Sequence, residues 1–318
     1  MTQAILDVRD LTVHYHTSQG PVQAVDGVSF EIRERERLGL VGESGSGKTT
    51  VALALLQLIR PPGKIERGQV LLDGIDLVSL SPEAMRKMRL AGVALVAQGA
   101  MNSLNPVARI KSQIRDALRD HDAKLSSRAL DARVRELLES VGLRPDVANM
   151  FPHELSGGMK QRVCMAIAIS LQPRLIIADE PTSALDVVVQ RQVMDTLLQV
   201  SEDLHASILL IGHDMGLMAQ VADRVGIMYA GSFAEVSPSA ELFSNPLHPY
   251  SQLLINSLPT LEEQGVLKGI PGLPPSLLNR PIGCPFRARC PRAFERCAVE
   301  KPLLREVQPD RQVACHLY

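Results

Sequence analysis

The chain has 318 residues, of which 45% are hydrophobic and 22% charged, a balance typical of soluble globular proteins. The formal net charge of −1 gives no reason to expect a nucleic acid as partner. The sequence shows neither a run of about 18 apolar residues, which could span a bilayer, nor the basic and apolar segments of a signal peptide. We therefore expect a cytoplasmic protein with one large domain and a further region.

The N-terminal region alternates apolar and polar side chains as β-strands do, most clearly over 5–8, 11–15 and 28–32. Tyr15 ends the second segment and is one of few aromatic residues in a chain without tryptophan. Two interpretations of Tyr15 are open: a side chain that packs on the sheet, or a platform for a purine ring. The apolar segment 37–41 then predicts a short buried strand.

Residues 42–49 match G-x-x-x-x-G-K-[ST], the phosphate-binding loop, and a leucine-rich helix is predicted over 50–59. The glycines let successive backbone N–H groups turn toward a phosphate at the positive end of that helix. Lys48 would reach the β- and γ-phosphates, and the Thr49 hydroxyl would bind Mg²⁺. A glycine- and serine-rich turn without a ligand is the alternative. We expect a bound nucleoside triphosphate to contact Gly42, Glu43, Ser44, Gly45, Ser46, Gly47, Lys48, Thr49 and Thr50.

Strands and helices alternate after the phosphate loop. The pattern predicts a strand over 69–72, a helix from about Ser81, and a buried strand over 93–97 that ends at Gln98. Over 107–142 apolar residues recur at helical spacing instead. This change predicts an all-helical insertion that forms a small lobe in an otherwise α/β protein.

Two later strands end in polar residues that suit a nucleotide site. An apolar run over 175–178 ends in Asp179 and Glu180, a pair of carboxylates suited to Mg²⁺ and water beside a phosphate loop. The run over 207–212 ends at His213. A lone histidine at a strand end is usually structural, but ligands of parallel sheets bind at this edge, so both interpretations are open.

Proline becomes frequent from Pro238 onward and the periodicity fades, which predicts a loop-rich C-terminal extension. The last 35 residues hold four of the five cysteines: Cys284, Cys290, Cys297 and Cys315. Their intervening lengths of 5, 6 and 17 residues match neither common zinc sites nor ferredoxin runs. Free thiols, two disulfides in an oxidising preparation, and a metal centre that staples this segment are all open. Cys164, on an apolar helix, is interpreted as a packing residue.

Together these motifs resemble those of the ATP-binding subunits of ABC transporters, along essentially the whole chain. The segment from Leu155 to Arg162, LSGGMKQR, looks like the ABC signature, which other phosphate-loop ATPases lack. The order of the motifs is that of the family: the phosphate loop, Gln98, the signature, Asp179 with Glu180, residues 183–186 (Ser183, Ala184, Leu185, Asp186), and His213.

The resemblance implies an α/β fold, that of an ABC-type phosphate-loop ATPase with a RecA-like core, an antiparallel β subdomain, a helical subdomain and a loop-rich C-terminal extension. It implies an ATPase domain over 1–237, with the helical subdomain inserted at about 99–172, and the extension over 238–318.

The resemblance also implies a role for each matching residue. Tyr15 would stack on adenine, while Lys48 and Thr49 would hold the phosphates and Mg²⁺. Asp179 would hold Mg²⁺ through water, and Glu180 would polarise the attacking water.

Further implied roles concern the γ-phosphate and a second subunit. Gln98 would bind Mg²⁺ and link it and the attacking water to the helical lobe, and His213 would contact the γ-phosphate. Asp186 would lie in a loop that communicates across a dimer. In this family an N–H-rich helix start of one subunit caps ATP bound by the other. The residues that match this helix start are Ser156, Gly157 and Gly158.

The loop after Gln98 departs from the family pattern. Oligopeptide-type relatives follow the glutamine with an acidic residue and proline, whereas Gly99 and Ala100 stand here, and residues 103–106 still fit. Neither altered position should touch nucleotide, so hydrolysis is expected to be intact. What Gly99 and Ala100 put in doubt is how stiffly this loop transmits motion to a membrane partner.

The C-terminal extension resembles the tail of dipeptide, oligopeptide and nickel importer ATPases, through residues 248–250, 270–272 and 283–290. Members of that subfamily carry a [4Fe–4S] cluster at the matching cysteines. The resemblance therefore implies such a cluster, structural or redox-sensing, in preference to zinc. The arginines expected to offset its negative charge are Arg287, Arg289, Arg292 and Arg296.

The function implied is ATP hydrolysis, with Mg²⁺, that powers solute import at the cytoplasmic face of the inner membrane. The expected partners are permease subunits, a second ATPase subunit, identical or paralogous, and indirectly an external binding protein. Peptides are the preferred cargo, ahead of nickel and oligosaccharides. Two alternatives are a soluble ABC ATPase acting on DNA or ribosomes, and an iron–sulfur or zinc protein whose ATPase is secondary. The absence of a coiled-coil insertion and the intact Glu180 argue against them.

Overall fold

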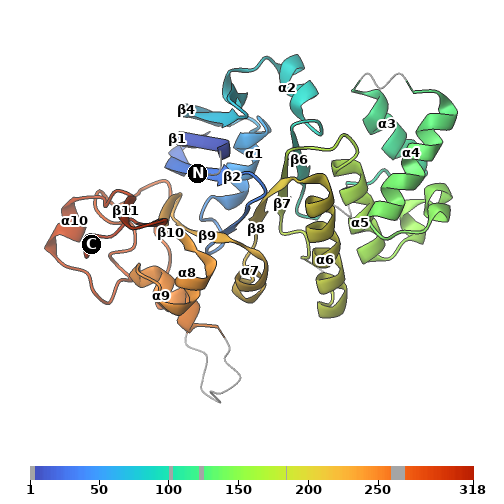
Figure 1. Cartoon of the computed structure of the whole chain (residues 1–318). Helices are drawn as coiled ribbons and strands as arrows, with labels where there is room; N and C mark the ends of the chain where they lie inside the picture. Colours follow the sequence, from blue (N-terminus) through green and yellow to red (C-terminus); the bar gives the residue numbers. More distant parts are fainter. Residues whose placement is uncertain (1–3, 100–102, 122–124, 184, 259–268) are drawn as a thin grey trace. The chain divides into compact units, whose positions relative to one another are not determined.

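The computed structural model of the chain describes residues 4–99, 103–121, 125–183, 185–258 and 269–318 (Figure 1). Its contacts divide the chain into two compact units. The first unit comprises the chain start up to residue 5 together with 33–35 and 79–209, and the second comprises 6–32, 36–78 and 210–318. Within the described residues, no helix combines the length and the apolar character needed to cross a membrane.

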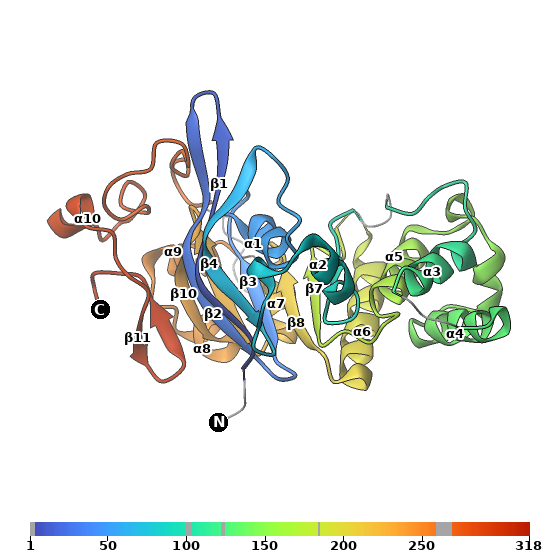
Figure 2. The same ribbon diagram turned by 90° about the horizontal axis from the view of Figure 1, so that it is seen from above.

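The second unit carries an antiparallel sheet with the strand order β2-β1-β4-β5 (Figure 2). Its strands are β1 (Ala4–Thr17), β2 (Gly20–Arg33), β4 (Gly63–Leu72) and β5 (Ile75–Asp76). The sequence predicts two strands at 5–8 and 11–15, whereas the structure has one, with a register shift against β4 between Arg9 and Thr12. A shift of this kind changes which side of the strand is buried. The residues that it keeps in the core are Leu6, Val8, Leu11 and Val13.

A second group of strands in this unit has the order β11-β12-β10-β9-β3. These strands are β3 (Arg37–Val41), β9 (Arg224–Tyr229), β10 (Ser232–Pro238), β11 (Arg305–Gln308) and β12 (Arg311–Val313). β3 and β9 are parallel, and the remaining pairs are antiparallel. The apolar segment 37–41 is therefore a buried strand, as the sequence predicts.

The helices of the second unit are α1 (Lys48–Leu55), α7 (Met215–Val221), α8 (Ser239–Ser244), α9 (Pro249–Asn256) and α10 (Glu295–Val299). A short 3-10 helix, η1 (Leu77–Ser79), follows β5 in the chain. The helix predicted over 50–59 thus ends earlier than expected. The C-terminal extension contains more regular structure than its sequence predicts. β12 pairs with β10, and the short helices are held by large buried side chains such as Tyr250, which is fully buried.

The first unit holds three strands in the order β8-β7-β6. These are β6 (Val93–Val96), β7 (Leu175–Asp179) and β8 (Ser207–Ile211), and the division between the units falls inside β8. β6 and β7 are parallel, with Val96 opposite Ala178. Parallel strands bring their carboxyl ends to one edge, so Gln98 and Glu180 follow neighbouring strands there.

The helices of the first unit are α2 (Pro82–Met88), α3 (Ile110–Arg119), α4 (Ser127–Ser140), α5 (Gly157–Ala168) and α6 (Val187–Leu204), with the 3-10 helices η3 (Pro145–Asn149) and η4 (Pro152–Glu154). α3, α4 and α5 pack against one another (Figure 1). The helical insertion predicted from the sequence is therefore present. Its apolar stripe, with Ile110, Ile114 and Leu118 on α3, forms the local core.

Candidate functional site

The phosphate loop connects β3 to α1 in the order that the sequence predicts. Gly42 has a φ of 146°, and a Cβ there would lie 2.2 Å from the carbonyl oxygen of Met228. Gly47 has a φ of 104°, and a Cβ there would lie 2.3 Å from the carbonyl oxygen of Ala24. Both positions combine a left-handed backbone with a close backbone neighbour, so only glycine fits.

The ammonium group of Lys48 lies inside the phosphate loop. Its Nζ donates to the carbonyl oxygens of Gly42 at 2.8 Å and Glu43 at 3.1 Å, and to Ser46 Oγ at 3.3 Å. Lys48 is also the first residue of α1, whose first turn carries no acidic side chain. The loop thus concentrates a fixed positive charge at the positive end of a helix, which favours a bound phosphate group.

Tyr15 lies on β1 opposite Gly63 of β4. A Cβ on Gly63 would be 2.6 Å from Tyr15 Cε1, so the edge of the tyrosine ring packs directly on that glycine. The side chain is only partly buried. Tyr15 therefore packs on the sheet without being fully buried, and its role as a platform for adenine stays a prediction.

His213 is exposed, between the end of β8 and the start of α7. The N–H of the preceding Gly212 donates to the carbonyl oxygen of Leu40 at 3.2 Å. Leu40 belongs to β3, the strand that leads into the phosphate loop. The next residue, Asp214, caps α7 by accepting from Leu217 N at 3.0 Å.

Glu180 and Gln98 meet at the edge formed by β6 and β7. Gln98 Nε2 donates to Glu180 Oε2 at 2.8 Å. The backbone of Glu180 has a φ of 45°, a left-handed conformation that is uncommon for a residue with a side chain. Ser183 supports this conformation, since its N–H and its hydroxyl both donate to the Glu180 carbonyl oxygen, at 3.1 and 3.0 Å. Asp179, just before it, is 3% exposed.

The signature segment begins α5. Ser156 is the exposed N-cap residue, and its Oγ accepts from Met159 N at 3.3 Å. A Cβ on Gly158 would lie 2.5 Å from Val189 Cγ1, so α5 approaches α6 closely at this point. The start of α5 therefore packs against α6 at Gly158, while Ser156 is exposed and Gly157 is partly exposed.

Asp186 is the N-cap residue of α6. Its Oδ1 accepts from Val188 N at 3.1 Å and from Val189 N at 3.0 Å. Val187 and Val188 are 80% and 67% exposed, which is unusual for apolar side chains. Of the motif over 183–186, Ala184 lies outside the described residues, as does Ala100 of the loop after Gln98.

The predicted site residues thus fall into two groups. Tyr15, the phosphate loop 42–50 and His213 belong to the second unit. The other group belongs to the first unit and consists of Gln98, Ser156, Gly157, Gly158, Asp179, Glu180 and Asp186.

All five cysteines lie in the described part of the chain, and none of them forms a disulfide bond there. The pKa of Cys284 is raised to about 11, mainly by burial and in smaller part by the charges of Cys297, Cys315 and Cys290. The described residues nevertheless include no group of three or more His, Cys, Asp or Glu side chains arranged to hold a metal ion. Burial raises the pKa of Cys164 to about 12, in agreement with a packing role.

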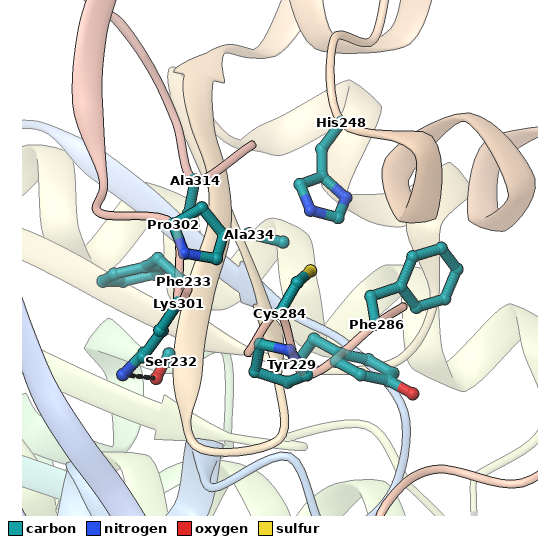
Figure 3. Close-up of a pocket in the computed structure, with 11 residues that line it drawn as sticks. Tyr229, Ser232, Phe233, Ala234, His248, Cys284, Phe286, Lys301, Pro302 and Ala314 are labelled. Atoms are coloured by element: carbon teal, nitrogen blue, oxygen red, sulfur yellow. Dashed lines mark hydrogen bonds between the residues drawn. The ribbon is translucent and has the colours of Figure 1, made fainter. Parts of the chain in front are cut away.

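Cys284 lines a small cavity of about 30 Å³ together with Tyr229, His248 and Phe286 (Figure 3). This volume holds about one water molecule. Burial lowers the pKa of His248 to about 4, and its Nδ1 accepts from Tyr250 N at 2.9 Å. The histidine is therefore a neutral helix cap, and the cavity is part of the packing of the extension.

Three of the four arginines expected around the cysteines have other partners. Arg287 donates to the Ala298 carbonyl oxygen at 2.9 Å, and Arg296 pairs with Glu300 at 2.7 Å. Arg292 does act on the cysteines: burial raises the pKa of Cys290 and of Cys315, and the charge of Arg292 opposes that rise. Arg289 instead pairs with Glu43 of the phosphate loop. The sequence does not indicate this contact, because 246 residues separate the two side chains and no local pattern marks it.

Comparisons with known proteins agree with this geometry. The family described as "ABC transporter" matches residues 25–183, and "Oligopeptide/dipeptide transporter, C-terminal region" matches 234–297. The chain is 41% identical over 316 residues to the dipeptide transport ATP-binding protein DppD of Caldanaerobacter subterraneus subsp. tengcongensis, covering 99% of this chain and 97% of the relative. It is 43% identical over 314 residues to the oligopeptide transport ATP-binding protein OppD of Bacillus subtilis, covering 97% and 87%.

Solved structures show the same fold. The cassette MJ0796, in a dimeric post-hydrolysis state bound to ADP and Pi, matches with a TM-score of 0.66 and 26% identity, covering 74% of this chain and 98% of that one. CbiO1 from Clostridium perfringens, part of the complex cbiONQ, matches with a TM-score of 0.65 and 25% identity, covering 76% and 91%.

Proposed function

Because this chain belongs to the ABC transporter family and carries the C-terminal region of its oligopeptide/dipeptide members, we propose that it hydrolyses ATP to power the import of dipeptides or oligopeptides. The observation that carries the proposal is the similarity of about 40% identity to dipeptide and oligopeptide transport ATP-binding proteins over nearly the full chain. This similarity includes the C-terminal extension, which lies beyond the ABC transporter match that ends at residue 183.

The proposed roles of the site residues follow their positions and chemistry. Lys48 and the loop N–H groups bind the phosphates, and Tyr15 offers its partly accessible ring to the adenine. The Thr49 hydroxyl and the Asp179 carboxylate are oxygen donors of the kind that Mg²⁺ prefers, and bound Mg²⁺ neutralises phosphate charge. The amide oxygen of Gln98 would be the third protein ligand of Mg²⁺.

We assign catalysis to Glu180 in the first unit and to the exposed His213 in the second. Glu180 accepts the proton of the attacking water, and the hydrogen bond from Gln98 at 2.8 Å holds its carboxylate in place. His213 contacts the γ-phosphate from the end of β8. The left-handed φ of 45° at Glu180 supports this assignment, since such conformations concentrate at active sites.

We propose that the chain works as an ATPase dimer, with an identical or paralogous partner, on permease subunits at the cytoplasmic face of the membrane. The exposed start of α5 at Ser156 and the exposed Val187 and Val188 beside Asp186 support a partner on this side of the first unit. The ATPase domain is assigned to residues 1–237, with the helical subdomain at about 99–172, and the peptide-transporter extension to 238–318.

A [4Fe–4S] cluster on Cys284, Cys290, Cys297 and Cys315 is a further part of the proposal. The chemistry of the donor set fits, because none of the four thiols is in a disulfide bond and thiolates are the ligands that iron–sulfur clusters take. The charges of the other cysteines also raise the pKa of Cys284, after the larger effect of burial, and ligation would relieve that repulsion. The side chains are not arranged as a metal site in this structure. Iron and acid-labile sulfide in anaerobically purified protein, lost in Cys290→Ser, would support the cluster, and stoichiometric zinc or four titratable thiols would refute it.

Uptake of labelled solutes by cells tests the cargo. Cells that carry Lys48→Ala in place of the natural chain should lose dipeptide and oligopeptide uptake, because the phosphate loop then lacks its central positive charge. The same cells should take up nickel and oligosaccharides normally. Loss of nickel or oligosaccharide uptake with peptide uptake unchanged would contradict peptides as the cargo.

A further inference from the structure

The phosphate loop is fastened to the C-terminal extension at Glu43. The Glu43 carboxylate receives two parallel hydrogen bonds from Arg289, with Nη1 to Oε2 at 2.6 Å and Nη2 to Oε1 at 2.8 Å. The backbone N–H of Glu43 donates to the hydroxyl of Tyr250 at 3.0 Å. Side chain and backbone of one loop residue are therefore both held by residues more than 200 positions away in sequence.

Arg289 is rigidly placed for this contact. Its side chain is 4% exposed, and its other donors reach Tyr229 Oη at 3.3 Å and the carbonyl oxygens of Pro271 and Ile270 at 2.9 and 3.3 Å. All five N–H donors of the guanidinium are thereby used. The charged group also lies 5.8 Å from the centre of the Tyr229 ring, within the range of a cation–π contact.

The electrostatic need for Arg289 arises from the position of Glu43. A carboxylate in a loop that holds a triphosphate repels the ligand unless a positive charge compensates it. Arg289 supplies that charge with bidentate geometry, which is the strongest form of this pair. The same residue, Glu43, offers its carbonyl oxygen to Lys48 Nζ at 3.1 Å, so a movement of Glu43 also moves the oxygen that holds the phosphate-binding lysine.

The extension continues along the same side of the loop. A cavity of about 210 Å³ is lined by Glu43, Ser44, Gly45 and Ser46 of the loop and by Pro274, Pro275 and Leu277 of the extension. Gly272, with a φ of 79°, lets the chain turn there, and a Cβ at this position would lie 3.3 Å from Arg289 Cγ. The proline-rich segment thus runs beside the loop and packs on the arginine that holds it.

We propose that Arg289 is a positioning residue for ATP binding: it neutralises Glu43 and fixes the phosphate loop in its binding conformation. The inference rests on ATP binding by residues 42–50. It assigns to the C-terminal extension a direct part in nucleotide affinity, in addition to any part in cargo transport.

The test measures the dissociation constant of MgATP for the purified full chain. Arg289→Ala should weaken binding about tenfold or more, since removing the arginine leaves the part-buried Glu43 carboxylate uncompensated in the phosphate loop. The double variant Arg289→Ala with Glu43→Gln should recover most of that loss, because no unpaired carboxylate then stands in the phosphate loop. Loss of folding cannot produce such a rescue.

Arg296→Ala serves as the matched control. It removes an arginine from the same extension, but its pair with Glu300 is half-exposed on both sides, so ATP affinity should not change. If thermal denaturation shows that Arg289→Ala is not folded, Arg289→Lys takes its place. Lysine keeps the charge but not the planar two-donor geometry, so ATP binding should weaken less, and Glu43→Gln should again restore it.

Unchanged affinity in a folded Arg289→Ala would overturn the inference. So would weakened affinity that Glu43→Gln fails to restore, since the arginine would then act on folding rather than on Glu43. Absence of ATP binding by the natural chain would instead refute the nucleotide site itself, so the two failures are distinguishable.

Discussion

At the scale of single residues, two side chains support Glu180: Gln98 donates to its carboxylate at 2.8 Å, and the Ser183 hydroxyl donates to its carbonyl oxygen at 3.0 Å. Lys48 and Glu180 were predicted because their motifs are local and fixed in spacing. The hydrogen bond from Gln98 to Glu180, however, joins residues that are 82 positions apart, so no local pattern indicates it. The left-handed backbone at Glu180 depends on Ser183 and could not be read from residue types alone.

Glu180→Gln should leave ATP binding intact and lower hydrolysis by about two orders of magnitude or more, because the amide is nearly isosteric but cannot take a proton from water. Equilibrium ATP binding and single-turnover hydrolysis measured on the same preparation separate the two effects. Gln98→Ala is a useful companion, since it leaves Glu180 ionisable but without its hydrogen bond, and its loss should be smaller. Near-normal turnover in Glu180→Gln would remove the residue from the catalytic role.

His248 gives a pH dependence with a definite sign. Burial lowers its pKa from 6.5 to about 4, so between these values the unfolded chain binds a proton that the folded chain does not. Its contribution to stability is therefore complete above about pH 6.5 and is lost as the pH falls toward 4, by about 3 kcal/mol in total.

His248→Asn checks this, because asparagine keeps an acceptor for the start of α9 and does not titrate. The free energy of unfolding should fall less steeply with decreasing pH in the variant than in the natural chain. Parallel curves from pH 7 to 4 would show that His248 is not the titrating group. A vertical offset between parallel curves would reflect packing alone.

At the scale of elements, segments with a clear apolar pattern were predicted correctly and segments without one were not. α3 and α4 follow from apolar residues at helical spacing, and β3 and β7 follow from short apolar runs. The helix α9 and the hairpin of β11 and β12 lie in the proline-rich extension, where no such pattern marks them. Their stability comes from pairing with β10 and from buried side chains such as Tyr250.

The contact between α5 and α6 predicts a cost for any side chain at Gly158. In Gly158→Ala the new Cβ would lie 2.5 Å from Val189 Cγ1, so the helices must move apart or Val189 must change rotamer. Overpacking of this kind costs about 1–3 kcal/mol in the free energy of unfolding. Adding Val189→Ala should restore most of the loss, as measured by chemical denaturation. Additive losses in the double variant would contradict a direct clash.

At the scale of the whole molecule, the phosphate loop and the C-terminal extension, both in the second unit, are joined by direct contacts. Arg289 and Tyr250 hold Glu43, so the extension that distinguishes the peptide-transporter group also supports the loop that all phosphate-loop ATPases share. The family and its overall fold were predictable from ordered motifs. This link was not, because it depends on how a proline-rich segment folds back on the loop.

The most direct test of the account is ATP hydrolysis by the chain assembled with its permease and its ATPase partner in lipid vesicles. We predict that an external binding protein loaded with a dipeptide or oligopeptide stimulates hydrolysis, that the unloaded binding protein stimulates it less, and that Lys48→Ala abolishes the stimulation. Hydrolysis that no peptide stimulates, or that responds only to nickel or to an oligosaccharide, would contradict a peptide-import ATPase.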